Sequence, residues 1–179
     1  MGASIASLLG DRDYADVALV ETVDNRAAGS DVCVLTGDVE SIGSVGAALS
    51  RIAPAAVLMV VAEPPDLAAH VVLGSSEFPR ARVIALPGGD HGAGSTEAGR
   101  IAEMIDSIVL DRWDVFSCLV LCRGEYGIDD AYAAVPCRLG ARGVEEIVGD
   151  DVPKDELSTL RGSATPTADL ADLPGGPGD

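Results

Sequence analysis

Lysine is almost absent from this 179-residue sequence, which contains one lysine, Lys154, and eleven arginines. With 29 acidic residues against 12 basic ones, the formal net charge is -17. Such a surface repels the phosphates of nucleic acids and anionic membranes, so we exclude both as partners. Concentrated salt would screen this self-repulsion, as in a salt-accumulating organism; an ordinary acidic protein from a GC-rich genome is the equal alternative.

Aromatic residues and histidines are also scarce. Aromatics make up 3% of the chain, so the core must consist of Val, Ile, Leu and Ala, which is typical of a parallel sheet covered by helices. Two histidines and the lack of a C-x-x-C pair argue against a metal site. The sequence has neither a membrane-spanning apolar run nor a signal sequence. We therefore expect a cytoplasmic protein with four reduced cysteines.

Apolar runs and helical periods alternate in the first half of the chain. The patterns predict helices over residues 3–9, 44–52 and 66–73, the last capped by Asp66, and strands over residues 17–20, 31–36, 56–61 and 82–86. This alternation is typical of a βαβ layered domain.

The second half changes character. It predicts an amphipathic helix over residues 96–111, strands over 115–122, 131–139 and 143–148, and a helix over 154–160. The acidic tail, residues 165–179, is rich in Pro and Gly and is predicted to be disordered. The expected division is therefore 1–87, 88–164 and the tail 165–179.

Six segments resemble malate and lactate dehydrogenases and occur in the same order. They are residues 28–37 (AGSDVCVLTG), 58–66 (LMVVAEPPD), 78–84 (FPRARVI), 124–130 (GEYGIDD), 135–140 (VPCRLG) and 143–148 (GVEEIV). The chain is similar to a truncated, internally shortened member of this family; the acidic composition would make it haloarchaeal. The resemblance implies an α/β fold, a Rossmann-like parallel sheet with helices that lacks its first strand, followed by a reduced α+β C-terminal portion.

The resemblance also implies NAD as cofactor, with four candidate binding residues. Gly2 looks like the last glycine of the family's pyrophosphate-binding motif, whose first strand and first two glycines are missing unless the true start lies upstream. Glu21 stands where an acidic residue would bind the ribose hydroxyls, or is simply a solvated strand-end carboxylate. Thr36 and Gly37 align with the family's TAG turn against the dinucleotide.

The substrate side departs further from the family pattern. The family's arginines, which grip the substrate carboxylate, are missing from residues 37–43 (GDVESIG), and Glu63 replaces a substrate-contacting Asn. The family's Asp- and Arg-bearing LDSARFR segment is absent. His91 is the candidate catalytic histidine, although we prefer a solvated loop histidine. Arg80 and Arg82 match structural positions of the family.

Three hypotheses follow. We prefer a non-catalytic or degenerate relative that keeps part of the NAD-binding scaffold and associates as a homo-oligomer or with a full-length relative. The alternatives are an active NAD-dependent dehydrogenase acting on a 2-hydroxy acid such as malate, and a gene remnant or mis-started product. Each missing contact to the reacting substrate typically costs several kcal/mol of transition-state stabilisation.

Overall fold

The computed structural model describes residues 2–10, 12–14, 16, 18, 23–87, 97–149, 154–171 and 173. The α-helices are α1 (Gly2–Gly10), α2 (Val39–Ile52), α3 (Pro65–Ser75), α4 (Glu97–Val109), α5 (Lys154–Gly162) and α6 (Thr167–Ala171). The strands are β1 (Val32–Thr36), β2 (Val57–Ala62), β3 (Val83–Pro87), β4 (Asp114–Arg123), β5 (Asp129–Gly140), β6 (Gly143–Ile147) and β7 (Thr165–Pro166). Three 3-10 turns cover Asn25–Ala27, Arg80–Arg82 and Glu125–Gly127.

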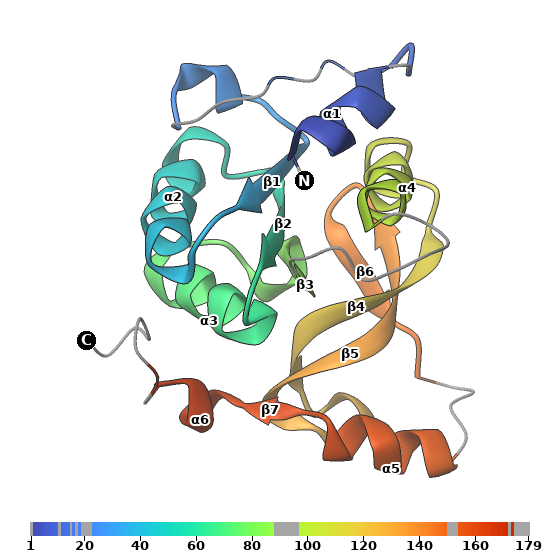
Figure 1. Cartoon of the computed structure of the whole chain (residues 1–179). Coiled ribbons are helices and arrows are strands. Elements are labelled where there is room, and N and C mark those ends of the chain that lie inside the picture. Colours follow the sequence, from blue (N-terminus) through green and yellow to red (C-terminus); the bar gives the residue numbers. More distant parts are fainter. Residues whose placement is uncertain are drawn as a thin grey trace.

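These strands form one seven-stranded mixed sheet. Its order is β1-β2-β3-β4-β5-β6, with β7 paired to β5. The first three strands are parallel, and the pairs β3–β4, β4–β5 and β5–β6 are antiparallel (Figure 1). The predicted α/β class is confirmed. The expected boundary between residues 87 and 88 falls where β3 ends, inside this continuous sheet.

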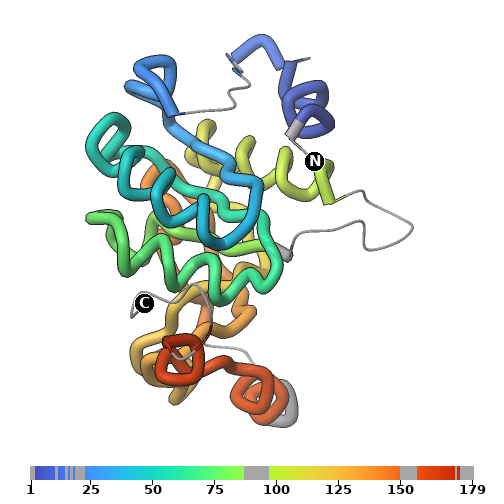
Figure 2. The backbone as a smooth tube through the Cα atoms, turned by 60° about the vertical axis from the view of Figure 1, so that its left-hand side comes forward, coloured from blue at the N-terminus to red at the C-terminus, as the bar shows by residue number. Residues whose placement is uncertain are grey.

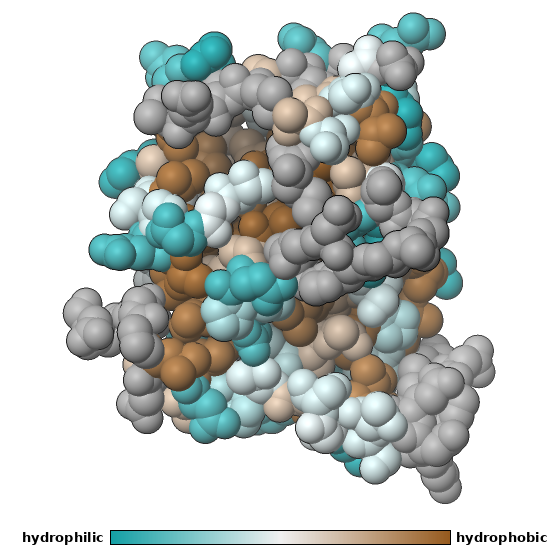
Figure 3. Space-filling model, in the orientation of Figure 1, coloured by the Kyte–Doolittle hydropathy of each residue, from teal (hydrophilic) through white to brown (hydrophobic). Residues whose placement is uncertain are grey.

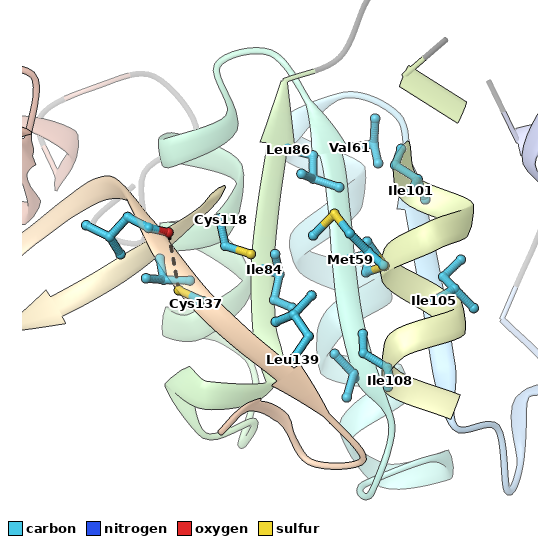
Figure 4. Close-up of a cluster of buried hydrophobic side chains, with 14 of the residues drawn as sticks. Met59, Val61, Ile84, Leu86, Ile101, Ile105, Ile108, Cys118, Cys137 and Leu139 are labelled. Atoms are coloured by element: carbon cyan, nitrogen blue, oxygen red, sulfur yellow. Dashed lines mark hydrogen bonds between the residues drawn. The ribbon is translucent and has the colours of Figure 1, made fainter. Parts of the chain in front are cut away.

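Strand β2 is the centre of the parallel part and is buried along its whole length. Successive side chains of a strand point to opposite faces, so its residues enter two different cores. Met59 and Val61 pack in a first core with residues of α1 and α4 (Figure 4), whereas Leu58 and Val60 pack in a second core with residues of α2 and α3. The parallel part is therefore a three-layer helix–sheet–helix arrangement.

Two glycines let α2 and α3 approach each other closely. A Cβ atom on Gly43 would lie 2.6 Å from Cγ1 of Val71, and one on Gly46 would lie 3.2 Å from Cγ1 of Val72. Side chains at these positions would push the two helices apart, because both valines are buried in the second core.

The antiparallel β4–β5 ribbon carries buried thiols. Cys118, Cys122 and Cys137 are buried and, like Cys33, are free, as expected from the sequence. A hydrogen bond with Cys118 and burial raise the pKa of Cys137, and burial raises the pKa of Cys122 to about 11. The Cys137 thiol lies 3.4 Å from the carbonyl of Val135 (Figure 4). These protonated thiols behave as small apolar core residues.

The C-terminal arm, residues 154–171, lies at the end of the molecule opposite α1 (Figure 2). Strand β7 pairs with the start of β5, and Leu170 of α6 is buried in the second core. The hydroxyl of Thr167 donates a hydrogen bond of 2.7 Å to the carboxylate of Asp130. The prediction of disorder from residue 165 onward is therefore wrong for residues 165–171, because an internal β-pair and one buried leucine order a segment that has no periodicity.

Two helix boundaries also differ from the sequence prediction. Helix α2 begins at Val39 rather than at residue 44, because Asp38 caps it by accepting a 2.9 Å hydrogen bond from the amide of Ser41. Asp66 lies within the first turn of α3 and does not cap it, since Pro64 holds the N-cap position. The strand predicted over residues 17–20 lies largely outside the described residues.

The surface mixes hydrophilic and apolar side chains (Figure 3). Among the described residues, the large apolar side chains that are exposed are Leu8, Tyr14, Leu110, Trp113, Val115 and Leu173. No helix in the described part of the chain is long and apolar enough to cross a membrane.

An ion pair fastens the segment after α1 to α4. The guanidinium of Arg12 donates hydrogen bonds of 2.9 and 2.8 Å to the two carboxylate oxygens of Asp106, and the Tyr14 hydroxyl donates a further bond to the same carboxylate. Burial opposes ionisation of Asp106, which is 8% exposed, but these donors outweigh it and lower the pKa of the carboxyl group.

We expect Asp106→Asn to lower the free energy of unfolding by about 1–2 kcal/mol at neutral pH, because it weakens charge-assisted hydrogen bonds. A carboxyl group whose pKa is lowered in the folded state stabilises above its unfolded pKa, about 4, and loses this effect as pH falls through the folded pKa. Urea unfolding of the natural protein and the variant at several pH values should show that their difference in free energy of unfolding decreases from neutral to acidic pH. Asp24→Asn, which removes an exposed local pair with Arg26, is the control; an equal effect of both substitutions would contradict the assignment.

Candidate functional site

The parallel strands β1, β2 and β3 end at one edge of the sheet. Because parallel strands run in the same direction, Thr36, Ala62 and Pro87, their last residues, all lie at this carboxyl edge. In open α/β sheets ligands bind outside the carboxyl ends of the strands. The carboxyl edge is therefore the candidate site.

The turn between β1 and α2 exposes its backbone. Thr36 and Gly37 are both exposed, and Gly37 has a φ of +155°, which side chains rarely adopt. A Cβ atom there would lie 3.3 Å from the Ser41 hydroxyl. A backbone hydrogen bond from Ser41 lowers the pKa of Asp38, so a carboxylate already occupies the N-terminus of α2. A ligand can approach the backbone at Gly37, but a phosphate would meet that negative charge.

The next turn adds more acidic groups. Glu63 is exposed, the Glu63–Pro64 peptide bond is cis, and the Asp66 carboxylate accepts a 2.9 Å hydrogen bond from the amide of Leu67. With Asp38, the turns after β1 and β2 thus carry three carboxylates at the edge. This arrangement disfavours a dicarboxylate ligand by like-charge repulsion.

The structure describes three of the five candidate site residues that were predicted from the sequence. Thr36 and Gly37 lie side by side at the carboxyl edge, and Gly2 is the first residue of α1. Glu21 and His91 lie outside the described residues. The roles of all five therefore remain predictions.

Helix α4 brings charged residues that the sequence analysis had treated only as part of an amphipathic helix. Its N-terminal end lies at the carboxyl edge, since Ile101 neighbours Val61 and Ile108 lies toward the opposite end of the sheet (Figure 4). Glu97 and Arg100 occupy the first turn of this helix. Only the pairing of strands distant in sequence could have revealed this position.

A pocket of about 300 Å³ lies elsewhere, between the Arg80–Arg82 turn, β4 and β6. Arg80 donates a hydrogen bond of 2.8 Å to the carbonyl of Leu121 and one of 2.7 Å to Glu125, and this bond, opposed by burial, holds the pKa of Glu125 at about 2. Glu145 and Glu146 of the lining pair with Arg142 and Arg138. Because its charges are already paired, this pocket is structural, as expected for Arg80.

His70 has a more buried setting than expected for a helix-surface residue. Its ring lies edge-on to Tyr132 at a centroid distance of 6.0 Å. Burial lowers the pKa of His70, and the charge of Asp130 partly opposes this. The Tyr132 hydroxyl is buried and has no hydrogen-bond partner in the described structure.

Among the described residues, no group of three or more His, Cys, Asp and Glu could hold a metal ion.

Comparison with known proteins shows which family this chain resembles. Residues 89–165 match the model of the lactate/malate dehydrogenase α/β C-terminal domain. The malate dehydrogenase of Thermomicrobium roseum is 24% identical in an alignment that covers 95% of this chain and 94% of the relative. This chain is therefore similar to malate and lactate dehydrogenases, most specifically in residues 89–165.

A second malate dehydrogenase shows where the sequence match is strongest. Malate dehydrogenase of Salinibacter ruber is 44% identical over 63 residues, which are 35% of this chain but 20% of the relative. At least 110 of the 289 aligned positions of the Thermomicrobium protein have no counterpart in this 179-residue chain. The chain is therefore shorter than these family members, and the Salinibacter match spans only a fifth of that protein.

Solved family structures have the same fold. Malate dehydrogenase of Archaeoglobus fulgidus in complex with NADH has a TM-score of 0.67 at 18% identity, covering 78% of this chain and 74% of that chain. The enzyme of Salinibacter ruber has a TM-score of 0.63 at 23% identity, covering 76% and 72%. The expected resemblance to malate and lactate dehydrogenases is thus confirmed, in sequence over residues 89–165 and in fold over about three quarters of the chain.

The Arg80–Glu125 pair predicts a second stability effect. Glu125→Gln should lower the free energy of unfolding by about 1–3 kcal/mol at neutral pH, because Arg80 would lose its charged acceptor. A folded pKa of about 2 means that this stabilisation is present above the ordinary glutamate pKa and fades as pH falls toward 2. Urea unfolding at several pH values measures it. Glu146→Gln, which removes an exposed pair, should have little effect; if the two variants are equal, the assignment is wrong.

Proposed function

We propose that this chain is a dinucleotide-binding member of the family that does not reduce a 2-oxo acid by the family's route. The exposed Thr36–Gly37 turn carries this proposal, because it places a positive-φ glycine at the carboxyl edge, where its backbone is open to close approach by a flat, extended ligand. The NADH-bound Archaeoglobus relative has the same fold, which supports NAD as the ligand.

The residues present fit a dinucleotide in part. Gly37 allows backbone contact, and a Cβ atom there would crowd Ser41. Thr36 and Gly37 would hold the dinucleotide, with Gly2 at the start of α1 and Glu21 as further proposed contacts. NAD would supply hydride acceptance or donation when bound.

The acidic carboxyl edge supports the proposal that this chain does not reduce a 2-oxo acid as malate and lactate dehydrogenases do. A 2-oxo dicarboxylate such as oxaloacetate would meet Asp38 and Glu63 rather than an arginine of the loop after β1. We interpret His91 as a solvated loop histidine rather than a catalytic remnant, and even a remnant histidine would not replace a carboxylate grip. Orientation of the reacting groups is worth several kcal/mol of activation free energy, and its loss would abolish useful turnover.

The setting of the protein is part of the same proposal. We place it in the cytoplasm of a salt-accumulating cell, because its thiols are free and its net charge of -17 is tolerated best where salt screens repulsion. Self-association, or association with a full-length relative, would cover its exposed apolar side chains.

Titration of the protein with NADH, followed by fluorescence or calorimetry in high salt, tests binding. We expect saturable binding by the natural protein and at least about tenfold weaker binding by Gly37→Val, whose side chain blocks backbone approach. Gly149→Val, at an open position with nothing within 4 Å, is the matched control. Circular dichroism verifies that both variants fold.

A turnover assay completes this test. With NADH and oxaloacetate, no absorbance loss above buffer is expected. Steady NADH oxidation would refute the non-catalytic proposal in favour of an active dehydrogenase. A lack of NADH binding would refute dinucleotide binding itself.

A further inference from the structure

Arg100 is a basic side chain at the otherwise acidic carboxyl edge. One of its guanidinium nitrogens donates a 3.2 Å hydrogen bond to the carbonyl of Ser117 on β4. Leu119, two residues after Ser117, pairs antiparallel with Ala85 near the end of β3. Arg100 is thus anchored next to the end of a parallel strand.

The guanidinium keeps donors available for a ligand. Six other arginines pair with carboxylates in the described structure: Arg12, Arg26, Arg80, Arg112, Arg138 and Arg142. Arg100 has no carboxylate within 4 Å among the described residues. A guanidinium has five N–H donors, and a single bond to a carbonyl leaves its charge uncompensated.

Glu97 provides the complementary group one turn earlier on α4. Its Oε1 atom is buried and has no hydrogen-bond partner in the described structure. A buried carboxylate oxygen without a donor is costly, so the site favours a ligand that supplies one. Side chains three residues apart on a helix lie about 5–6 Å apart at Cβ, so Glu97 and Arg100 can reach adjacent groups of one small molecule.

The charges at this edge select the class of ligand. Asp38 and Glu63 lie at the same edge, so a phosphate or a dicarboxylate meets repulsion. A molecule with one carboxylate and an adjacent cation has no net charge and matches both groups: its carboxylate faces Arg100 and its ammonium faces Glu97. A hydroxy acid would offer Glu97 a neutral hydroxyl donor in place of a charged ammonium group.

We propose that Glu97 and Arg100 form a recognition pair for a small α-amino acid in its zwitterionic form. The proposal goes beyond dinucleotide binding and rests on it only in taking the carboxyl edge as the ligand-binding face. Its test is made without NADH, so failure of one proposal is distinguishable from failure of the other.

Four ligands of similar size test the natural protein by NMR chemical-shift titration at constant ionic strength. They are L-alanine, L-lactate, propionate and ethylamine. L-alanine should bind most tightly, at least about tenfold more tightly than propionate, which lacks the ammonium group, and ethylamine, which lacks the carboxylate. Equal binding of L-alanine and propionate, or tighter binding of L-lactate, would overturn the proposal, as would the absence of L-alanine binding.

Single substitutions then test which side chain binds the carboxylate of the ligand and which binds its ammonium group. Arg100→Gln should weaken L-alanine and propionate alike, whereas Glu97→Gln should weaken L-alanine but leave propionate unchanged or improved. Glu103→Gln, an exposed position on the same helix, and Arg112→Gln, an exposed ion-paired arginine, are the controls and should bind as the natural protein does. If either test variant binds L-alanine as its control does, the pair is not the recognition site. Circular dichroism of the same variants verifies that they keep their fold.

Discussion

The burial of β2 on both faces is the constraint on which the other elements depend. Its residues are divided between two cores, one with α1 and α4 and the other with α2 and α3, so both helical layers are fixed relative to one strand. Parallel pairing on either side of β2 then brings the ends of β1, β2 and β3 to one level. The carboxyl edge is therefore a consequence of core packing, and the turns on it can vary in sequence without loss of the fold.

Most elements of the sheet could be predicted because their strands are short, uninterrupted apolar runs. The antiparallel junction could not, since Ala85 pairs with Leu119 across an intervening helix and no local pattern encodes that pairing. The C-terminal arm was missed for a related reason. A two-residue strand and a five-residue helix have no period of their own, and they are ordered by contacts of Thr167 and Leu170 with distant residues.

The candidate site was predicted in part for the same physical reasons. Thr36 and Gly37 follow a recognisable strand, so their place at the carboxyl edge could be predicted from the sequence. Arg100 could not be placed there, because its position depends on where α4 packs and on the β3–β4 pairing. The family resemblance concerns the loop after β1, where the arginines are absent, and gives no role to the polar residues of the amphipathic helix over residues 96–111.

Charge then limits what such an edge can bind. A net charge of -17 repels any anion at long range, and salt weakens this field without removing the local effect of Asp38 and Glu63. An anionic dinucleotide can still be held through backbone donors and apolar contacts spread over a long molecule. A small dianion has no such area, so it depends on paired arginines. On the proposed function, the scaffold would retain a cofactor-sized ligand without a dicarboxylate site, and the proposed small-ligand position would favour molecules that carry their own positive charge.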